Sequence, residues 1–288
     1  MKAPNFLYRR PHSLDEALAL LDDHAGDAQV LAGGQSLMPT LAMRLSSPGM
    51  LVDINRIAAL EGIVETADAI RLGALARHYQ VAASPLITRD VPLFASAMTH
   101  VAHMAVRNRG TTCGSLALAD PSAEAPAVAV LLNATIHLQS KSGAREVAAR
   151  DFFEGLYTTA RNDNEMLTGV SFPRAAQDEI FHFNELSRRH GDFAIVGIGL
   201  KGRKAGDSIG QIEAVIFGSE PAPLLSDAVA GLTITQNTSD AALRDMAQAI
   251  ADDMDPIDNH QGRPETKRRQ GAELLRRAFV SFREALDA

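Results

Sequence analysis

A single cysteine, Cys113, is present in the 288-residue chain, and this scarcity excludes an internal disulfide. It also excludes a zinc or iron–sulfur site held only by cysteines of this chain. Apolar residues never continue for the ~18 positions that a membrane-spanning helix needs, so the sequence predicts no membrane span. The first residues lack the apolar segment of a secretory signal peptide. Together these absences lead us to expect a cytoplasmic protein.

Positive charge is also scarce, because 28 lysines and arginines stand against 35 aspartates and glutamates and leave a net charge of −7. Nucleic-acid binding is therefore not expected, since the phosphate backbone requires a basic protein face. The composition is otherwise typical of globular proteins, with 46% hydrophobic and 22% charged residues, which excludes intrinsic disorder. A chain of this length corresponds to about two domains.

Strand-like and helix-like segments alternate without a regular βαβ repeat, which favours an α+β fold over a doubly wound parallel sheet. The polar segment 173–178 is the predicted boundary between two domains, 1–175 and 178–288. In the second domain we expect a three-stranded sheet backed by two helices. The strands are predicted at 181–186, 194–200 and 212–217, and the helices at 239–254 and 265–286.

The first of two glycine loops, Ala32-Gly33-Gly34-Gln35-Ser36, lies between a predicted strand and a predicted helix. Two adjacent glycines let backbone amides turn towards an anion, and the start of the helix adds partial positive charge. Gln35 and Ser36 could donate to phosphate oxygens. The loop matches neither of the two best-known nucleotide motifs, so an ordinary strand-to-helix turn remains the alternative.

The second glycine loop, Gly110–Ser115, offers two threonines, a serine and two glycines. Asp120 and Glu124 follow it, and their carboxylates could accept hydrogen bonds from ribityl or ribose hydroxyls. Two such loops in one domain indicate a site for a dinucleotide pyrophosphate. The alternative for Glu124 is a carboxylate in the first turn of a helix at 124–132, where the helix dipole favours negative charge.

Other chemistries find little support in the sequence. His100 and His103 could share a helix face, with Cys113 nearby, but no metal-binding motif accompanies them, and no metal site is predicted. Cys113 lacks a local signature that would name its base, and no G-x-S-x-G elbow is present.

Charge separates towards the end of the chain, into an acidic stretch at 240–258 and a basic stretch at 263–277. Solvated faces of two helices are the simpler interpretation, and a docking surface for a partner is the alternative.

Taken in order, the motifs resemble the FAD-binding medium subunit of the molybdenum hydroxylases, the xanthine dehydrogenase and carbon monoxide dehydrogenase family. The resemblance covers nearly the whole chain and looks closest to the enzymes that hydroxylate N-heteroaromatic rings, of the quinoline 2-oxidoreductase type. The motifs that carry it are Ala32–Leu37, Val106–Thr111, Gly114–Ala117, Asp120-Pro121-x-x-Glu124, Leu167–Val170, Ser187–Ala194 and Lys267–Arg269.

The resemblance implies an FAD-binding domain of the PCMH or vanillyl-alcohol-oxidase type, built from two subdomains, and a small C-terminal domain of the CO dehydrogenase flavoprotein type. It implies an electron-transfer subunit that receives electrons from two [2Fe–2S] clusters of a small partner subunit. FAD would pass them to an external acceptor, while a large partner subunit carries the molybdenum cofactor. A dimer of heterotrimers is expected, and no residue of this chain is expected to act as a catalytic acid or base.

The resemblance also implies which residues bind FAD. The first loop would hold the pyrophosphate, the second loop would hold the other side of the dinucleotide, and the remaining residues would line the FAD chain or the isoalloxazine. The candidates are Ala32, Gly33, Gly34, Gln35, Ser36, Leu37, Val101, Thr111, Gly114, Ser115, Asp120, Glu124, Leu167, His190, Asp192 and Phe193.

One departure from the family pattern is Cys113, which replaces the first glycine of a Gly-Gly pair. A cysteine fits there if the backbone is right-handed; otherwise the loop must shift. Two other functions stay open. A self-contained flavin oxidase of the same fold would need an acid–base pair over the flavin, for which only Asp192 and His190 are candidates. A flavin-free scaffold subunit has the Cys113 departure as its one support.

Overall fold

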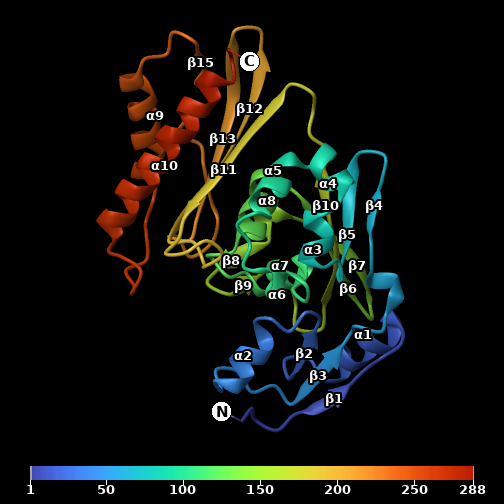
Figure 1. The fold of residues 1–288 in the computed structure, drawn as a ribbon. Coiled ribbons are helices and arrows are strands. Elements are labelled where there is room, and N and C mark those ends of the chain that lie inside the picture. Colours follow the sequence, from blue (N-terminus) through green and yellow to red (C-terminus); the bar gives the residue numbers. More distant parts are fainter. Residues whose placement is uncertain (1, 288) are drawn as a thin grey trace.

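The computed structural model describes residues 2–287, and its strands form three main sheets that follow one another along the chain (Figure 1). We name residues 2–57 the N-terminal lobe, 58–175 the middle lobe and 176–287 the C-terminal lobe. The middle lobe lies between the other two (Figure 1). The α+β class is therefore confirmed, and the first 175 residues form two lobes, as the resemblance implies. Among residues 2–287, no helix is both long enough and apolar enough to cross a membrane.

The N-terminal lobe is a small parallel sheet with two helices. Its elements are β1 (Leu7–Arg9), α1 (Leu14–Asp23), β2 (Ala28–Leu31), α2 (Leu37–Ala42) and β3 (Met50–Asp53). β1 and β2 each pair in parallel with β3, which is buried along its whole length. The last residues of β2 and β3, Leu31 and Asp53, are register partners. The first glycine loop and the residues after β3 therefore leave the sheet at the same edge.

The middle lobe is an antiparallel sheet with short helices on one side (Figure 1). Its strands are β4 (Ile63–Glu65), β5 (Ala69–Gly73), β6 (Thr135–Ser140), β7 (Gly143–Ala148) and β10 (Met166–Pro173), in the order β4-β5-β10-β6-β7. The helices are η1 (Ala58–Leu60), α3 (His78–Ala82), α4 (Pro85–Asp90), α5 (Pro92–Ala97), α6 (Met104–Arg107), α7 (Thr112–Leu118), α8 (Glu124–Leu131) and η2 (Ala149–Asp151). A separate two-stranded ribbon joins β8 (Phe153–Gly155) and β9 (Thr158–Thr159).

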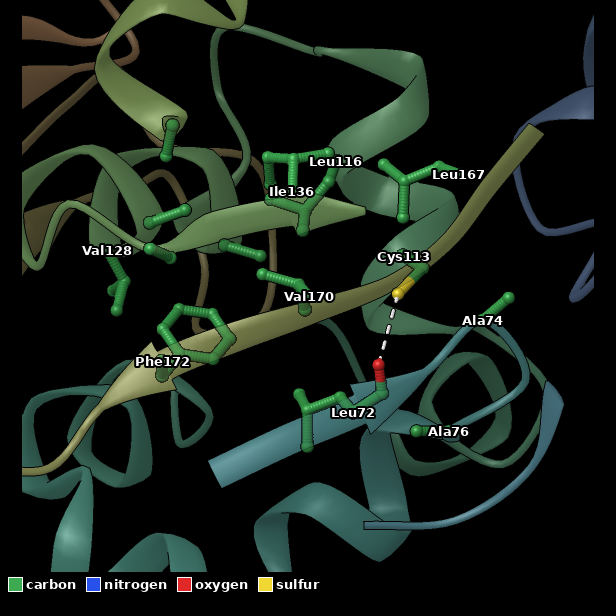
Figure 2. Close-up of a cluster of buried hydrophobic side chains, with 14 of the residues drawn as sticks. Leu72, Ala74, Ala76, Cys113, Leu116, Val128, Ile136, Leu167, Val170 and Phe172 are labelled. Carbon is green, nitrogen blue, oxygen red and sulfur yellow. Dashed lines mark hydrogen bonds between the residues drawn. The ribbon is translucent and has the colours of Figure 1, made fainter. Parts of the chain in front are cut away.

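The core of the middle lobe forms where the sheet meets α7 and α8. Figure 2 shows Leu116, Val128 and Ile136 gathered with Phe172, and each of these side chains is fully buried. α8 is buried at all eight of its positions, because it packs against α5 and α7 and also against the sheet of the C-terminal lobe. A helix in such a position has no solvent face, and its apolar residues show no one-sided pattern.

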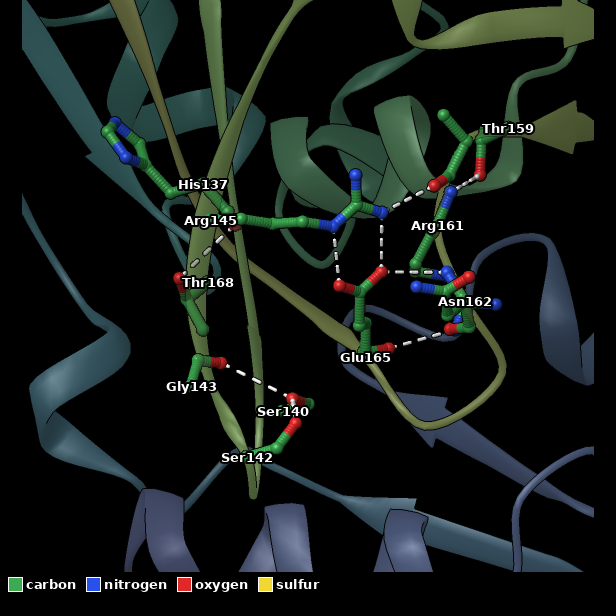
Figure 3. A network of polar contacts seen from close by, with 11 residues as sticks. His137, Ser140, Ser142, Gly143, Arg145, Thr159, Arg161, Asn162, Glu165 and Thr168 are labelled. Carbon is green, nitrogen blue, oxygen red and sulfur yellow. Dashed lines mark hydrogen bonds and ion pairs between the residues drawn. The ribbon is translucent and has the colours of Figure 1, made fainter.

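A polar network fixes the segment that leads into β10 (Figure 3). Arg145 of β7 donates two hydrogen bonds to the Glu165 carboxylate, at 2.6 and 2.7 Å, and a third to the Ala160 carbonyl at 2.6 Å. Glu165 also accepts from the Asn162 amide at 2.7 Å. The hydrogen bonds from Arg145 hold the pKa of Glu165 below its usual value.

The C-terminal lobe is an antiparallel sheet with two helices against it (Figure 1). It consists of β11 (Glu179–Leu186), β12 (Val196–Ala205), β13 (Ser208–Phe217), β14 (Leu224–Ser226), β15 (Ile234–Thr235), α9 (Asp240–Asp252) and α10 (Pro264–Glu284). The prediction of three strands is wrong: the three long strands are present, but β14 and β15 extend the sheet to five. These strands have three and two residues, too few for a period-two pattern to mark them.

The basic stretch at the start of α10 is partly internal. Lys267 is fully buried, and its ammonium donates to the Ile257 carbonyl at 2.8 Å and to Asn259 Oδ1 at 3.0 Å. Arg268 donates to the Met254 carbonyl at 3.0 Å. Neither the solvated-face nor the docking interpretation holds for Lys267, which fastens the connection between α9 and α10, whereas the half-buried Arg268 keeps part of its side chain at the surface.

Candidate functional site

The first glycine loop has the backbone geometry that its glycines permit. Gly34 has φ +70°, in the left-handed region that favours glycine. Gly33 packs directly on the second glycine segment. A Cβ at Gly33 would collide with the Arg109 carbonyl oxygen and would lie 2.9 Å from the Gly110 Cα. The two glycine segments therefore touch across the boundary between the N-terminal and middle lobes.

The second glycine segment is not the loop that the sequence suggested. Thr111 is the N-cap of α7, and its hydroxyl accepts a hydrogen bond from the Gly114 amide at 3.1 Å. The prediction of a loop over Gly110–Ser115 is wrong, because glycine and threonine are common in loops but threonine also favours the first position of a helix. Gly114 is exposed and Ser115 is half-buried, whereas Thr112 and Cys113 are buried, so only one side of the first turn of α7 reaches the surface.

Cys113 lies inside this helix, which explains how a cysteine can stand where the family pattern has a glycine. The backbone is right-handed there, so a Cβ carries no penalty. Its side chain is buried in the core, with the sulfur 3.6 Å from the Gly73 carbonyl oxygen and 3.9 Å from that of Leu72 (Figure 2). Burial raises the pKa of the Cys113 thiol to about 12, so the group stays protonated and inert.

A cavity of about 410 Å³ opens where the two lobes meet, and we name it the glycine-loop cavity. Its walls are Leu31, Ala32, Gly33, Gly34, Gln35, Met38, Pro39, Asp53, Asn55 and Arg109. Four of the predicted residues line it, namely Ala32 to Gln35. Ser36 is exposed outside the lining, and Leu37 starts α2.

Three polar residues of the cavity lining were not predicted from the sequence. Asp53 and Asn55 stand at the end of the buried strand β3, and Arg109 precedes the second glycine segment. A usable signal existed for the first two, because polar residues that follow a buried parallel strand mark ligand-binding edges. Arg109 adds a cationic residue to the lining, and a guanidinium can pair with an anion.

Asp120 and Glu124 lie near each other at the start of α8, away from the glycine-loop cavity. Glu124 is buried, with 7% of its surface exposed. Burial, together with the charges of Glu185 and Asp120, raises the pKa of Glu124 to about 8. Burial also raises the pKa of Asp120, which accepts hydrogen bonds from the Ser122 amide and the Tyr157 hydroxyl. We name Asp120, Glu124 and Glu185 the carboxylate cluster.

The remaining candidates lie beside this cluster. His190, Asp192 and Phe193 are exposed on the loop between β11 and β12, with Phe193 60% exposed. The loop rests on the segment that contains Val101, because a Cβ at Gly191 would lie 3.0 Å from the Ala102 backbone.

His100 links this loop to the carboxylate cluster. Its Nδ1 lies 3.7 Å from Glu185, and its ring centroid lies 6.1 Å from that of His190. The other carboxylate oxygen of Glu185 is buried without a hydrogen-bond partner among the described residues. Val101 and Leu167 are buried core residues.

The predicted polar and glycine residues thus lie in three places: the first glycine loop at the lobe boundary, the start of α7 with Thr111, Gly114 and Ser115, and the carboxylate cluster with the 187–193 loop. Only residues of the first place line the glycine-loop cavity. Within residues 2–287, no set of three or more His, Cys, Asp or Glu side chains is placed to hold a metal ion.

Comparison with known families assigns the two parts of the chain. The FAD binding domain in molybdopterin dehydrogenase matches residues 4–175, and the CO dehydrogenase flavoprotein C-terminal domain matches residues 181–282. The fold and the paired glycine segments therefore define an FAD-binding flavoprotein.

Individual relatives identify the family within this class of flavoproteins. The caffeine dehydrogenase subunit beta of Pseudomonas sp. strain CBB1 is 41% identical over 71% of both chains. The carbon monoxide dehydrogenase medium chain of Hydrogenophaga pseudoflava is 32% identical over 97% of both. The structure of quinoline 2-oxidoreductase from Pseudomonas putida 86 superposes with a TM-score of 0.92, at 32% identity and 99% coverage of both chains. The chain belongs to the FAD-binding medium chains of the molybdenum hydroxylases, a family of oxidoreductases.

Proposed function

We propose that the glycine-loop cavity holds the pyrophosphate of FAD and that the isoalloxazine lies towards Phe193 and the carboxylate cluster. The contact between Gly33 and the Arg109–Gly110 backbone carries this proposal, because it places the start of the second glycine segment directly against the loop that lines the cavity. Arg109 supplies the positive charge that a diphosphate requires. On this assignment, FAD extends from the lobe boundary along the outer turn of α7, past Thr111, Gly114 and Ser115.

The carboxylate cluster and the 187–193 loop suit the polar chain and the ring of the cofactor. Glu124 with a raised pKa is protonated at neutral pH, so its carboxyl can donate as well as accept hydrogen bonds. Phe193 presents an exposed aromatic face that a flat ring can cover. Val101 and Leu167 are buried apolar residues, and their proposed role at the flavin rests on the family resemblance.

The proposed role of the chain is electron transfer within a three-subunit complex. FAD held at this site would supply a carrier for one or two electrons, and the residues of the two glycine segments and the carboxylate cluster would bind, orient and shield it. We infer a small iron–sulfur partner with two [2Fe–2S] clusters, a large partner with the molybdenum cofactor, an external acceptor, and a dimer of heterotrimers in the cytoplasm. These inferences rest on the family, and the division into domains 1–175 and 178–288 rests on the predicted boundary.

Two measurements test this proposal. Purification through a tag on this chain should recover two further subunits together with FAD, iron and molybdenum. Acid precipitation should release the flavin into the supernatant, because the family gives no support for a histidine or cysteine of this chain as a covalent flavin tether. A colourless preparation would remove the FAD assignment, and flavin that stays in the pellet would remove the non-covalent one.

A further inference from the structure

A chain of hydrogen bonds joins the two glycine segments from behind the cavity. Arg77, the N-cap residue of α3 in the middle lobe, extends its half-buried guanidinium to the lobe boundary. Its Nη1 donates to the Arg109 carbonyl, and its Nη2 donates to Asn55 Oδ1. The Arg109 carbonyl oxygen is the same atom on which Gly33 packs. Arg77 therefore fixes the contact point of the two segments.

Asn55 carries the connection into the N-terminal lobe. Its amide nitrogen Nδ2 donates to the Ala32 carbonyl at 2.8 Å and to Asp53 Oδ1 at 2.6 Å. Ala32 is the first residue of the first glycine loop. A continuous path thus runs from the second segment through Arg77 and Asn55 to the first.

Asp53 anchors the far end of this path. Its carboxylate accepts hydrogen bonds from the Tyr8 hydroxyl and from the Asn55 amide at 2.9 Å, and Arg10 lies 3.4 Å away. Although burial opposes ionisation, the hydrogen bonds from Tyr8 and Asn55 hold the pKa of Asp53 below its usual value. The negative charge is retained and orients the Asn55 amide towards it.

We propose that Arg77 is a positioning residue that, through Asn55, holds the two glycine segments in the arrangement that receives the FAD pyrophosphate. We name Arg77, Asn55 and Asp53 the lobe brace. Arg77 does not line the cavity, so it acts through the backbone that it holds. This inference rests on the proposed FAD site. The brace lowers the cost of binding because the segments are ordered before the ligand arrives.

The geometry requires an arginine. A guanidinium carries several donors in a planar fork and can serve two acceptors in fixed directions, whereas a lysine ammonium is a single point on a flexible stem. Arg77→Lys keeps the charge but cannot hold Arg109 and Asn55 together in the same way. Arg77→Met keeps most of the length and removes every donor.

The test is a fluorescence titration of the flavin-free, full-length chain with FAD. We expect Arg77→Met to raise the FAD dissociation constant about tenfold or more and Arg77→Lys to raise it less, since hydrogen bonds to charged groups are the strong ones. Asn55→Ala should weaken binding too. The double variant Arg77→Met/Asn55→Ala should bind only slightly more weakly than the worse single variant, because both changes break one path.

Arg145→Met is the matched control, because Arg145 also donates three hydrogen bonds (Figure 3) and does not line the cavity. Its FAD dissociation constant should stay within about twofold of wild type. An equal loss in this control would make the effect of Arg77→Met general destabilisation and overturn the brace. Additive losses for Arg77 and Asn55 would overturn it too.

Two further outcomes separate this inference from the proposed function. Tight FAD binding by wild type with unchanged binding by Arg77→Met and Arg77→Lys overturns the brace and leaves the FAD site standing. Failure of the folded wild-type chain to bind FAD overturns both. If Arg77→Met does not fold, the Arg77→Lys and Asn55→Ala titrations decide alone: both must bind FAD more weakly than Arg145→Met does, or the brace is wrong.

Discussion

The two ends of the candidate site are built in opposite ways. At the lobe boundary, Arg77, Asn55 and Asp53 have hydrogen-bond partners on both sides, and backbone contacts fix the glycine segments. In the carboxylate cluster, Glu124 is buried near other acids, and one oxygen of Glu185 has no partner among residues 2–287. One end is ordered before a ligand arrives, whereas the other holds groups whose protonation a ligand or a pH change can alter.

This difference suits the two parts of a flavin dinucleotide. A pyrophosphate keeps its charge, so a rigid cradle of amides can be complementary to it in every state. The isoalloxazine changes its electron and proton content during turnover, and adaptable neighbours suit it better. Four substitutions test whether the two ends differ in this way.

Gly34→Val should cause the largest loss of FAD affinity at the lobe boundary. A β-branched residue is strained at φ +70°, and its Cβ would lie 3.1 Å from the Leu31 side chain and 3.2 Å from Met38. We expect at least a hundredfold loss of FAD affinity in a chain that still folds, read from the flavin content after purification. Gly155→Val is the control, because nothing lies within 4 Å of a Cβ there. Stoichiometric FAD in the Gly34 variant would refute the loop assignment.

At the adaptable end, Glu124→Gln should change the pH dependence of stability. The folded pKa of about 8 exceeds the ordinary value of 4.5, so the folded chain holds an extra proton between these two pH values. The unfolding free energy therefore falls as pH rises across that window. Glutamine cannot ionise, so the variant should match wild type near pH 4 and exceed it near pH 9 by on the order of a few kcal/mol.

Urea unfolding of the flavin-free chain at several pH values measures this effect. The exposed Glu154 provides the control, because Glu154→Gln should run parallel to wild type. Parallel curves for Glu124→Gln would show that Glu124 is ionised in the folded chain at neutral pH, and the two ends would then not differ in the way described.

Arg109→Ala tests the side chain of Arg109 separately from its backbone carbonyl. The substitution removes the cationic group from the cavity wall but leaves the carbonyl oxygen that Arg77 holds. We expect FAD to bind about five- to tenfold more weakly, with a smaller dependence on salt. Arg56→Ala removes an exposed arginine nearby that does not line the cavity, and it should leave the affinity unchanged. Equal effects of the two substitutions would remove Arg109 from the site.

The smallest effect on FAD is expected for Cys113→Gly. The family pattern alone suggests that a glycine here would favour binding, but Cys113 is a right-handed, buried helix residue. We expect the variant to lose about 1–2 kcal/mol of stability with FAD affinity unchanged within about twofold. Cys113→Ala should recover part of that loss in thermal unfolding. A large loss of FAD from either variant would give the thiol a role beyond packing.

The sequence predicted the fold class and the first glycine loop because local patterns mark them. The paired glycines and the long apolar strands are short-range signals. It failed at α7 because Thr111 can begin a loop or a helix, and only its contact with the Gly114 amide decides. The burial of Lys267 could not be predicted from the sequence either, because its partners Ile257 and Asn259 lie in an irregular segment.

In the candidate site, too, locally marked residues were predicted and residues that meet only in the fold were not. Ala32 to Gln35 were found from spacing, but Asn55, Arg77 and Arg109 become neighbours only when two lobes meet. A local pattern in the sequence cannot record a contact that separate lobes create. The placement of Phe193 and Glu124 beside the flavin stays a prediction.

Titration of the flavin-free chain with FAD, FMN and riboflavin tests the central claim most directly. If the glycine-loop cavity holds the pyrophosphate, FAD should bind at least a hundredfold more tightly than FMN or riboflavin, which lack the diphosphate and adenosine. ADP should compete with FAD and should lose most of its affinity in the Gly34→Val variant. Equal affinity for FAD and FMN, or no competition by ADP, would contradict the account.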